Sequence, residues 1–262
     1  ADEICALARE IPVALNASTI SKEDASRIVS CARAASPARE VFAMHNFYPR
    51  PETGLDEAFF LARTRILQAV GMKVAAFIPG DERKRAPLFE GLPTLEAHRS
   101  IAPSAAFCEL VSRLGADSVF IGDPALSAYE YEIMRRFCED GVLLLPATLL
   151  PAFSSLYRRP FTNREDSPAA IVRFAESREY SSNAPQRETL MPEGCTERVR
   201  GSITMDNRLY ARYAGEIQLV RKDYPADPRV NVIGSVSKAH LRLADMLERG
   251  QKFMLIPEKA AL

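Results

Sequence analysis

A cluster of polar residues follows an apolar run in the first half of the chain, and its side chains are of the kinds that bind anions and transfer protons. The segment MHNFYPRPETGL, residues 44–55, places His45, Asn46, Tyr48, Arg50 and Glu52 close together. An arginine can bind a phosphate or a carboxylate through two parallel hydrogen bonds, and histidine and glutamate can transfer protons. The segment therefore predicts a site for an anionic small molecule. The alternative is a proline-stiffened loop whose polar groups satisfy one another.

Two further stretches carry residues suited to acid–base chemistry. LFEGLPTLEAHR, residues 88–99, contains Glu90, Glu96 and His98, and the IGDP run contains Asp123 directly after an apolar segment. Thr94 is typical of a helix N-cap, which would make Glu96 an ordinary first-turn carboxylate. An aspartate before a proline is likewise typical of a turn. We favour a functional role for Asp123, and for Glu96 we favour the structural alternative over catalysis.

The surrounding elements determine where these candidates lie. Apolar runs of strand length span residues 11–16, 41–45, 73–78 and 118–121, and helical patterns span 21–35, 55–70, 104–114 and 127–138. Runs that are apolar on both faces and alternate with helices predict a buried parallel sheet. Functional side chains gather at the carboxyl ends of such strands, which adds Asn16, after the first run, to the candidates.

The number of repeats is half of what a closed barrel requires. Four strand–helix units are present, whereas a closed (β/α)₈ barrel has eight. Ile4, Leu7 and Ala8 have helical spacing, so the sequence is expected to begin inside a helix. We therefore expect an N-terminal portion to be missing.

The second half of the chain does not continue this alternation of strand and helix patterns. We predict a first domain over 1–145 and a mostly β domain over 146–262. Strand-like runs span 203–205, 216–220, 230–236 and 253–256, with one helical pattern over 238–248. Asn207, Tyr210 and Arg212 lie between two of these strands, where they could be solvated turn residues or a polar rim of a ligand site.

Composition excludes several classes of protein. The 262 residues contain 34 Lys and Arg against 34 Asp and Glu, and this zero net charge argues against a nucleic-acid binder. No apolar run reaches the length of a membrane span. Five scattered cysteines without a C-x-x-C pair, and three distant histidines, predict neither a disulfide framework nor a metal site. We expect a cytoplasmic protein without a metal or a cofactor.

The longest motifs resemble one bacterial family. HNFYPRPETGL, AFIPGD, EGLPTLEAHR, IGDP, ITMDN, YARYAGEIQ and DPRVNVIG are similar to segments of the 6-phospho-N-acetylmuramidases, formerly described as outer surface proteins of unknown function. The resemblance runs from residue 11 to the end. It implies strands five to eight of a TIM barrel, with the first half of the barrel absent, followed by a small cyclophilin-like β domain.

The resemblance also implies an activity. It points to an intracellular glycosidase that cleaves 6-phospho-N-acetylmuramyl-β-1,4-N-acetylglucosamine in peptidoglycan recycling, with this phosphorylated disaccharide as its small-molecule partner. From their positions we predict Asp123 and Glu52 as the catalytic carboxylates. The predicted substrate-binding residues are Asn16, His45, Asn46, Tyr48, Arg50, Glu90, Glu96, His98, Asn207, Tyr210 and Arg212.

Three alternatives stay open. The same scaffold could be a non-catalytic sugar-phosphate binder or a surface interaction protein. A cyclophilin-like domain also raises a prolyl isomerase, although a fold does not carry a function by itself. A four-stranded half-barrel has two unpaired edges, which the missing half or another chain would cover, so homo-oligomer formation is also open.

Overall fold

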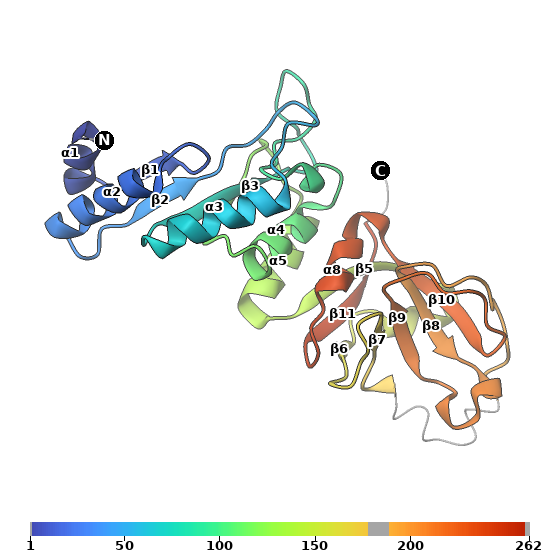
Figure 1. Ribbon diagram of the computed structural model, residues 1–262. Helices are drawn as coiled ribbons and strands as arrows, with labels where there is room; N and C mark the ends of the chain where they lie inside the picture. Colours follow the sequence, from blue (N-terminus) through green and yellow to red (C-terminus); the bar gives the residue numbers. More distant parts are fainter. Residues whose placement is uncertain (1, 178–188, 260–262) are drawn as a thin grey trace. The chain divides into compact units, whose positions relative to one another are not determined.

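The computed structural model describes residues 2–177 and 189–259. The chain forms two compact units, Ala1–Tyr131 and Glu132–Leu262 (Figure 1). Helix α5 (Ala128–Asp140) spans this division, and the domain boundary expected between residues 145 and 146 stays a prediction.

The N-terminal unit is built on a four-stranded parallel sheet in the order β1-β2-β3-β4. Its strands are β1 (Val13–Asn16), β2 (Val41–Met44), β3 (Lys73–Ile78) and β4 (Ser118–Ile121). Each strand pairs in parallel with the next one in the chain. This confirms the predicted barrel-type α/β unit, because neighbouring parallel strands in sequence order are the repeat from which such barrels are made.

Helices precede, connect and follow these strands, and the four helices predicted over 21–35, 55–70, 104–114 and 127–138 begin and end within two residues of those bounds. The helices are α1 (Asp2–Glu10), α2 (Lys22–Ala35), α3 (Glu57–Ala69), α4 (Pro103–Ser112) and α5, with a short 3₁₀ turn η1 (Glu96–His98). The hydroxyl of Ser21 accepts the N–H of Asp24 at 3.0 Å at the start of α2, and Ser127 accepts the N–H of Glu130 at 3.2 Å at the start of α5. Both contacts satisfy N–H groups that the first helical turn leaves free.

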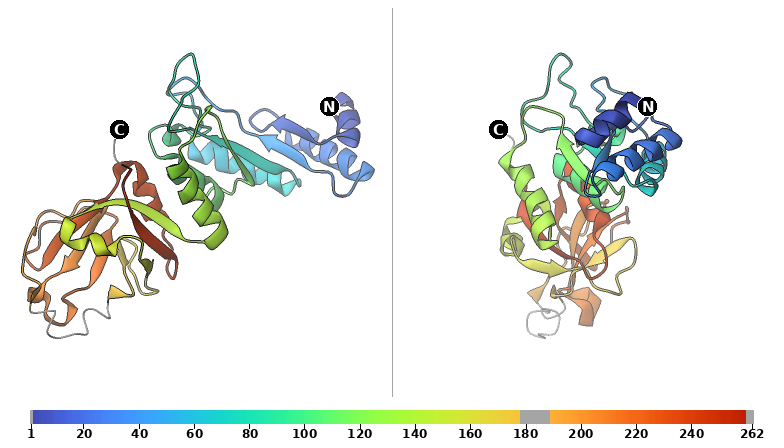
Figure 2. Two further views of the ribbon diagram at one scale, coloured as in Figure 1. Left: turned by 180° about the vertical axis from the view of Figure 1, so that it is seen from behind. Right: turned by 90° about the vertical axis from the view of Figure 1, so that its left-hand side faces the viewer.

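The two faces of this sheet differ in burial. Val41, Ala43 and Val74 are buried in a core shared with Ile28 and Leu67 of helices α2 and α3. Figures 1 and 2 show these helices running alongside the sheet.

The residues that alternate with Val41, Ala43 and Val74 along these strands point to the other face of the sheet. Phe77 is only half-buried there, and Phe120 in the edge strand β4 is 47% exposed. Their rings lie 5.8 Å apart. One face of the sheet is therefore packed, while the other presents aromatic side chains.

The C-terminal unit is a seven-stranded sheet in the order β6-β11-β5-β10-β8-β9-β7. Its strands are β5 (Leu143–Leu149), β6 (Pro160–Thr162), β7 (Ile171–Arg173), β8 (Ser202–Asp206), β9 (Ile217–Val220), β10 (Val230–Val236) and β11 (Lys252–Pro257). Shorter elements are η2 (Pro151–Leu156), η3 (Arg208–Tyr213), η4 (Lys238–His240) and helix α8 (Leu241–Met246). The unit is mostly β, as predicted.

Backbone hydrogen bonds join the two ends of this sheet. The N–H of Ala175 donates to Thr162 at 2.9 Å, and that of Arg164 donates to Arg173 at 3.0 Å, which links β6 to β7. The strands thus close around a core that contains Phe161, with the rings of Phe174 and Phe253 centred 4.8 Å and 5.8 Å from it. Closure removes the exposed edges that an open sheet would present.

Strand β5 is the element that the sequence conceals. No strand is predicted over these residues from the sequence, yet β5 lies in the middle of the sheet between β11 and β10. A proline in a central strand normally argues against that assignment. Pro146 is accommodated because the ladder with β10 begins only at Ala147, while the proline carbonyl accepts the N–H of Ser237 at 2.8 Å.

Candidate functional site

The candidate site of the N-terminal unit lies at the carboxyl edge of its parallel sheet. The loops there are residues 45–56 after β2, 79–95 after β3 and 122–127 after β4. They carry seven of the predicted site residues, while Glu96 and His98 lie in the η1 turn that follows the second loop and Asn16 is the last residue of β1. Five of these side chains are exposed at this edge, namely Asn16, Asn46, Arg50, Glu52 and Glu90, and Tyr48 is half-buried.

Two of the loops are joined to each other by backbone hydrogen bonds. The N–H of Tyr48 donates to Pro93 at 3.0 Å, and the N–H of Leu55 donates to Thr94 at 2.9 Å. The hydroxyl of Thr94 accepts the N–H of Phe77 at 2.9 Å and donates to the carbonyl of Asn46 at 3.0 Å. Thr94 is therefore not the expected N-cap. Its short, buried side chain fastens both loops to strand β3.

Arg99 and Glu96 reinforce this connection. The guanidinium of Arg99 binds both carboxylate oxygens of Glu96, at 2.6 and 2.7 Å, and also donates to the carbonyls of Tyr48, Arg50 and Gly91. The Glu96 carboxylate accepts the N–H of Gly54 at 2.8 Å. These contacts hold the backbone on which the side chains of Tyr48, Arg50 and Glu52 are mounted.

The ion pair also fixes the charge of Glu96. The bond from Arg99, followed by the backbone N–H groups of Glu52 and Gly54, lowers the pKa of Glu96 to about 2 against the opposing effect of burial. A carboxylate that is ionised and occupied in this way is poorly suited to donate a proton. Its predicted role in binding substrate stays a prediction.

Asp123 lies at the centre of the loops that follow β3 and β4. It is 6% exposed. One carboxylate oxygen accepts the N–H groups of Gly80 at 2.9 Å and Leu92 at 3.1 Å, and the other accepts that of Arg85 at 2.9 Å. Three backbone segments therefore converge on one side chain. This geometry gives Asp123 a positioning role, and its predicted catalytic role stays a prediction.

The backbone around Asp123 leaves little room for larger residues. A Cβ atom added to Gly80 would lie 2.2 Å from the carbonyl oxygen of Ala125, and one added to Gly122 would lie 2.5 Å from that of Leu92. The glycines of the AFIPGD and IGDP motifs are thus required by close packing between the loops.

His45 is buried at the start of its loop. Its Nε2 lies 3.3 Å from the hydroxyl of Thr64, and its ring is centred 4.4 Å from that of Phe60. Burial, and secondarily the charge of Arg63, lowers the pKa of His45 to about 4. The imidazole is therefore neutral near pH 7, so His45 would not act there as a cation for an anionic ligand.

His98 is also fully buried, and it binds a second acidic residue of the same unit. Its Nε2 lies 3.1 Å from Glu109, whose other oxygen accepts a bond from Arg113 at 2.6 Å. Both His98 and Glu109 are at most 1% exposed. The buried contact between His98 and Glu109 joins η1 to α4, while the side chain of Arg113 is half exposed.

The three remaining candidates belong to the C-terminal unit. Asn207 is buried, and its amide donates to Pro228 and Asn231 at 2.8 Å each. Tyr210 is half-buried with the guanidinium of Arg229 4.5 Å from its ring centre. Arg212 is exposed and donates to the hydroxyl of Tyr213 at 2.6 Å. Tyr210 and Arg212 therefore belong to the surface of the unit, while Asn207 is a buried residue that holds neighbouring segments together.

Sequence reasoning missed Arg99, which donates to the carbonyls of Tyr48, Arg50 and Gly91 in the two loops. Its spacing of three residues from Glu96 is that of a neighbouring pair on a helical turn, and this was the available indication. Arg63 was also missed. It donates to the carbonyls of Ala17 and Ile20 after β1, at 2.6 to 3.0 Å.

These features define the class of protein: a barrel-type α/β unit whose polar loops meet at the carboxyl edge of the sheet, followed by a closed β unit. The chain belongs to the 6-phospho-N-acetylmuramidase family. The family described as "6-phospho-N-acetylmuramidase, N-terminal" matches residues 1–136, and "6-phospho-N-acetylmuramidase, C-terminal" matches residues 148–256.

Two solved structures are similar to this chain. A conserved protein of unknown function from Enterococcus faecalis is 32% identical with a TM-score of 0.84, over 98% of this chain and 69% of that one. An uncharacterized B. cereus protein is 25% identical with a TM-score of 0.71, over 93% of this chain and 70% of that one. No curated protein matches the sequence.

Within residues 2–177 and 189–259, no helix combines the length and the apolar character that crossing a bilayer needs.

Proposed function

We propose that this protein is a glycosidase that cleaves 6-phospho-N-acetylmuramyl-β-1,4-N-acetylglucosamine in peptidoglycan recycling. Membership of the 6-phospho-N-acetylmuramidase family supports the proposal in both units. The observation that carries it is the loop after β2, where Arg50 and Glu52 are exposed on a backbone that Arg99 and Glu96 hold in place. We also propose a cytoplasmic location, a cyclophilin-like C-terminal unit and catalysis without a cofactor.

The proposed chemistry needs an acid and a group that attacks the anomeric carbon. The N-acetyl group of the muramyl sugar can supply the attacking oxygen as the bond from C1 to the bridging oxygen breaks. A protonated carboxyl transfers its proton to that leaving oxygen, and water then attacks C1 and restores the acetamido group. Glu52 is exposed and is our candidate for the acid. Asp123 is either the second carboxylate or the residue that positions the loops.

Arg50 is the proposed ligand of the phosphate. Its side chain is exposed, and its backbone carbonyl is fixed by Arg99 at 3.2 Å. An arginine held at its backbone loses less freedom when it binds a phosphate, which favours a two-point contact.

The experiment is incubation of the chain with the phosphorylated disaccharide, followed by mass spectrometry. We expect two monosaccharides whose summed mass exceeds that of the disaccharide by one water. The unphosphorylated disaccharide and the Glu52→Gln variant serve as controls, and both should react more slowly. Binding of the intact disaccharide without cleavage would instead support the sugar-phosphate-binding alternative.

A further inference from the structure

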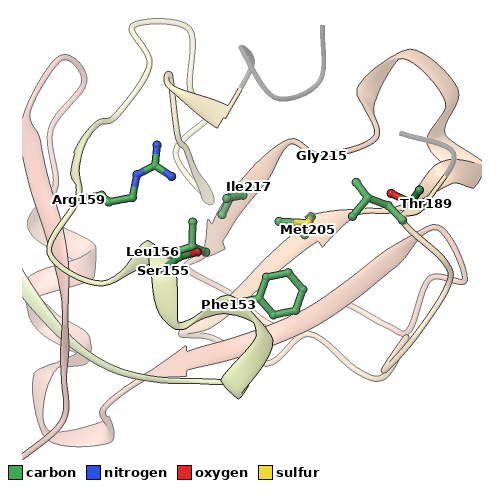
Figure 3. Close-up of a pocket in the computed structure, with 9 residues that line it drawn as sticks. Phe153, Ser155, Leu156, Arg159, Thr189, Met205, Gly215 and Ile217 are labelled. Carbon is green, nitrogen blue, oxygen red and sulfur yellow. The ribbon is translucent and has the colours of Figure 1, made fainter. Parts of the chain in front are cut away.

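A pocket of the C-terminal unit has a volume of about 280 Å³, and Phe153, Leu156, Met205 and Ile217 gather around it in Figure 3. Most of its described wall is apolar. The muramyl sugar of the proposed substrate carries a phosphate on C6 and, through an ether at C3, a lactyl group that ends in a carboxylate. Anions need charged or hydrogen-bonding partners, and the loops of the N-terminal unit offer these in greater number.

Arg85 is an exposed cation in the loop after β3. Its N–H donates to one carboxylate oxygen of Asp123 at 2.9 Å, and its carbonyl accepts the N–H of Phe89 at 3.2 Å. The backbone of Arg85 is thus held through both of its polar groups. In the part of the chain that the structure describes, no carboxylate pairs with its guanidinium. The charge of Arg85 is therefore available to a ligand.

The guanidinium of Arg85 lies over an aromatic side chain of the neighbouring loop. It is 5.8 Å from the ring centre of Phe47, which is close enough for a cation–π contact. Phe47 in turn meets the ring of Phe77 edge to face, with the ring centres 5.2 Å apart. Phe77 belongs to the aromatic face of the sheet, where it neighbours Phe120. Arg85 therefore lies at one end of a row of three rings.

The contact with Phe47 also connects Arg85 to the loop of the proposed phosphate ligand. Phe47 precedes Arg50 by three residues in the loop after β2. Arg99 donates to the carbonyl of Arg50 at 3.2 Å and to that of Gly91, in the loop of Arg85, at 3.1 Å. Two exposed cations on two loops that are fastened together match a sugar with two anionic groups.

The surroundings of Arg85 favour a carboxylate over a phosphate. A guanidinium above a ring keeps the N–H groups at its edge free for a two-point contact with a planar carboxylate. The lactyl group carries a methyl beside its carboxylate, and the half-buried ring of Phe47 offers that methyl an apolar surface. A phosphate has no apolar atom to place there. We propose that Arg85 binds the lactyl carboxylate and so selects muramyl over glucosaminyl sugars, an inference that rests on the proposed function.

The test compares N-acetylmuramic acid 6-phosphate with N-acetylglucosamine 6-phosphate, two sugars that differ in the lactyl group alone. Calorimetry measures the binding of each to the whole chain. We expect the muramyl sugar to bind about tenfold more tightly, because a hydrogen bond to a charged group contributes that much. Arg85→Gln should abolish this preference. Arg83→Gln removes the same charge from an exposed residue of the same loop and should leave the preference unchanged.

A further variant tests which arginine binds which anion. Both sugars carry the phosphate, so Arg50→Ala should weaken their binding alike. Loss of the preference in Arg50→Ala or Arg83→Gln, or its survival in Arg85→Gln, would overturn the assignment. Equal binding of the two sugars to the unmodified chain, or binding of neither, would overturn it without requiring any variant to fold.

Cleavage assays separate this inference from the glycosidase activity. If the chain shows the expected preference in binding but does not cleave the phosphorylated disaccharide, the proposed activity fails and the role of Arg85 stands. If it cleaves 6-phospho-N-acetylglucosaminyl-β-1,4-N-acetylglucosamine as fast as the muramyl disaccharide, the activity stands and the role of Arg85 in selecting the substrate is overturned.

Discussion

The guanidinium of Arg99 donates hydrogen bonds to both carboxylate oxygens of Glu96, with Nε 2.6 Å from Oε1 and Nη2 2.7 Å from Oε2. The same Nη2 donates to the backbone carbonyls of Tyr48 and Arg50, 49 to 51 residues earlier in the chain. One side chain thus joins the two loops that carry most of the candidate site. A planar group with several fixed donors is required for such a combination.

The first prediction follows from this geometry. Arg99→Lys keeps the charge but loses the two-point contact and most of the carbonyl contacts, so the loop carrying Arg50 and Glu52 should lose its fixed position. We expect kcat/KM for the phosphorylated disaccharide to fall by about tenfold to a hundredfold, as is usual when positioning is lost. Arg135→Lys is the matched control, because Arg135 pairs with Glu132 on the exposed surface of α5. An equal effect of both substitutions would contradict the positioning role.

The second prediction concerns the acid stability that Glu96 provides. Its pKa is lowered from 4.5 to about 2, chiefly by Arg99. A carboxyl with a depressed folded pKa stabilises the protein above its unfolded pKa, and this contribution is lost as the pH falls from 4.5 toward 2. As the pH is lowered below about 5, the midpoint of urea unfolding should therefore decrease less in Glu96→Gln than in the unmodified protein. The exposed Glu10, substituted in the same way, serves as the control.

The third prediction concerns His45. Burial, then the charge of Arg63, lowers its pKa from 6.5 to about 4. The unfolded chain therefore binds the proton more readily, and the contribution of His45 to stability should be complete above pH 6.5 and fall as the pH drops toward 4. The ring signals of His45 in an NMR titration check this directly. A midpoint near 6.5 would show that the ring is solvated.

The repeat of strands and helices was readable from the sequence, for a physical reason. Most residues of strands such as Lys73–Ile78 are buried, and the helices between the strands have capping residues such as Ser21. Local pattern and tertiary structure therefore agree. In the C-terminal unit, β5 contains Pro146, and β6 and β7 have three residues each. Such strands are stabilised by distant partners, which local periodicity does not reveal.

The candidate site was predictable in place but less so in role. The rule that loops follow the carboxyl ends of parallel strands located residues 45–52 and Asp123. It did not reveal whether a side chain points to solvent or into the protein. His98 and Asp123 turn inward to satisfy buried groups, whereas Arg50 and Glu52 stay exposed. That difference depends on contacts between loops distant in sequence.

The fourth prediction concerns the preference for phosphate. Arg50→Ala should weaken binding of the phosphorylated disaccharide by about tenfold or more, since a charged hydrogen-bond pair is lost. Binding of the unphosphorylated disaccharide should change much less. Calorimetry with both sugars measures the two losses, and Arg65→Ala, on the exposed face of α3, controls for net charge. Equal losses for both sugars would remove Arg50 from the phosphate site.

The last prediction decides between the two roles of Asp123. Its carboxylate accepts three backbone N–H groups, from Gly80, Arg85 and Leu92. An asparagine has one oxygen and would turn an N–H₂ group toward at least one of these donors. We therefore expect Asp123→Asn to cost about 1–3 kcal/mol of stability, measured by urea unfolding. If Asp123 also acts on the substrate, the turnover of the Asp123→Asn variant should fall by about two to four orders of magnitude.

Gly80→Ala provides the comparison for this prediction, because it disturbs the same loops and leaves the carboxylate in place. The added Cβ would lie 2.2 Å from the carbonyl oxygen of Ala125 and 3.0 Å from the Cβ of Asp123. If the aspartate only positions the loops, the two variants should lose turnover in proportion to their loss of stability. If it acts on the substrate, Asp123→Asn should lose far more turnover than Gly80→Ala at a similar loss of stability. Turnover close to that of the unmodified protein in Asp123→Asn would rule out both roles and leave Glu52 as the remaining candidate carboxylate.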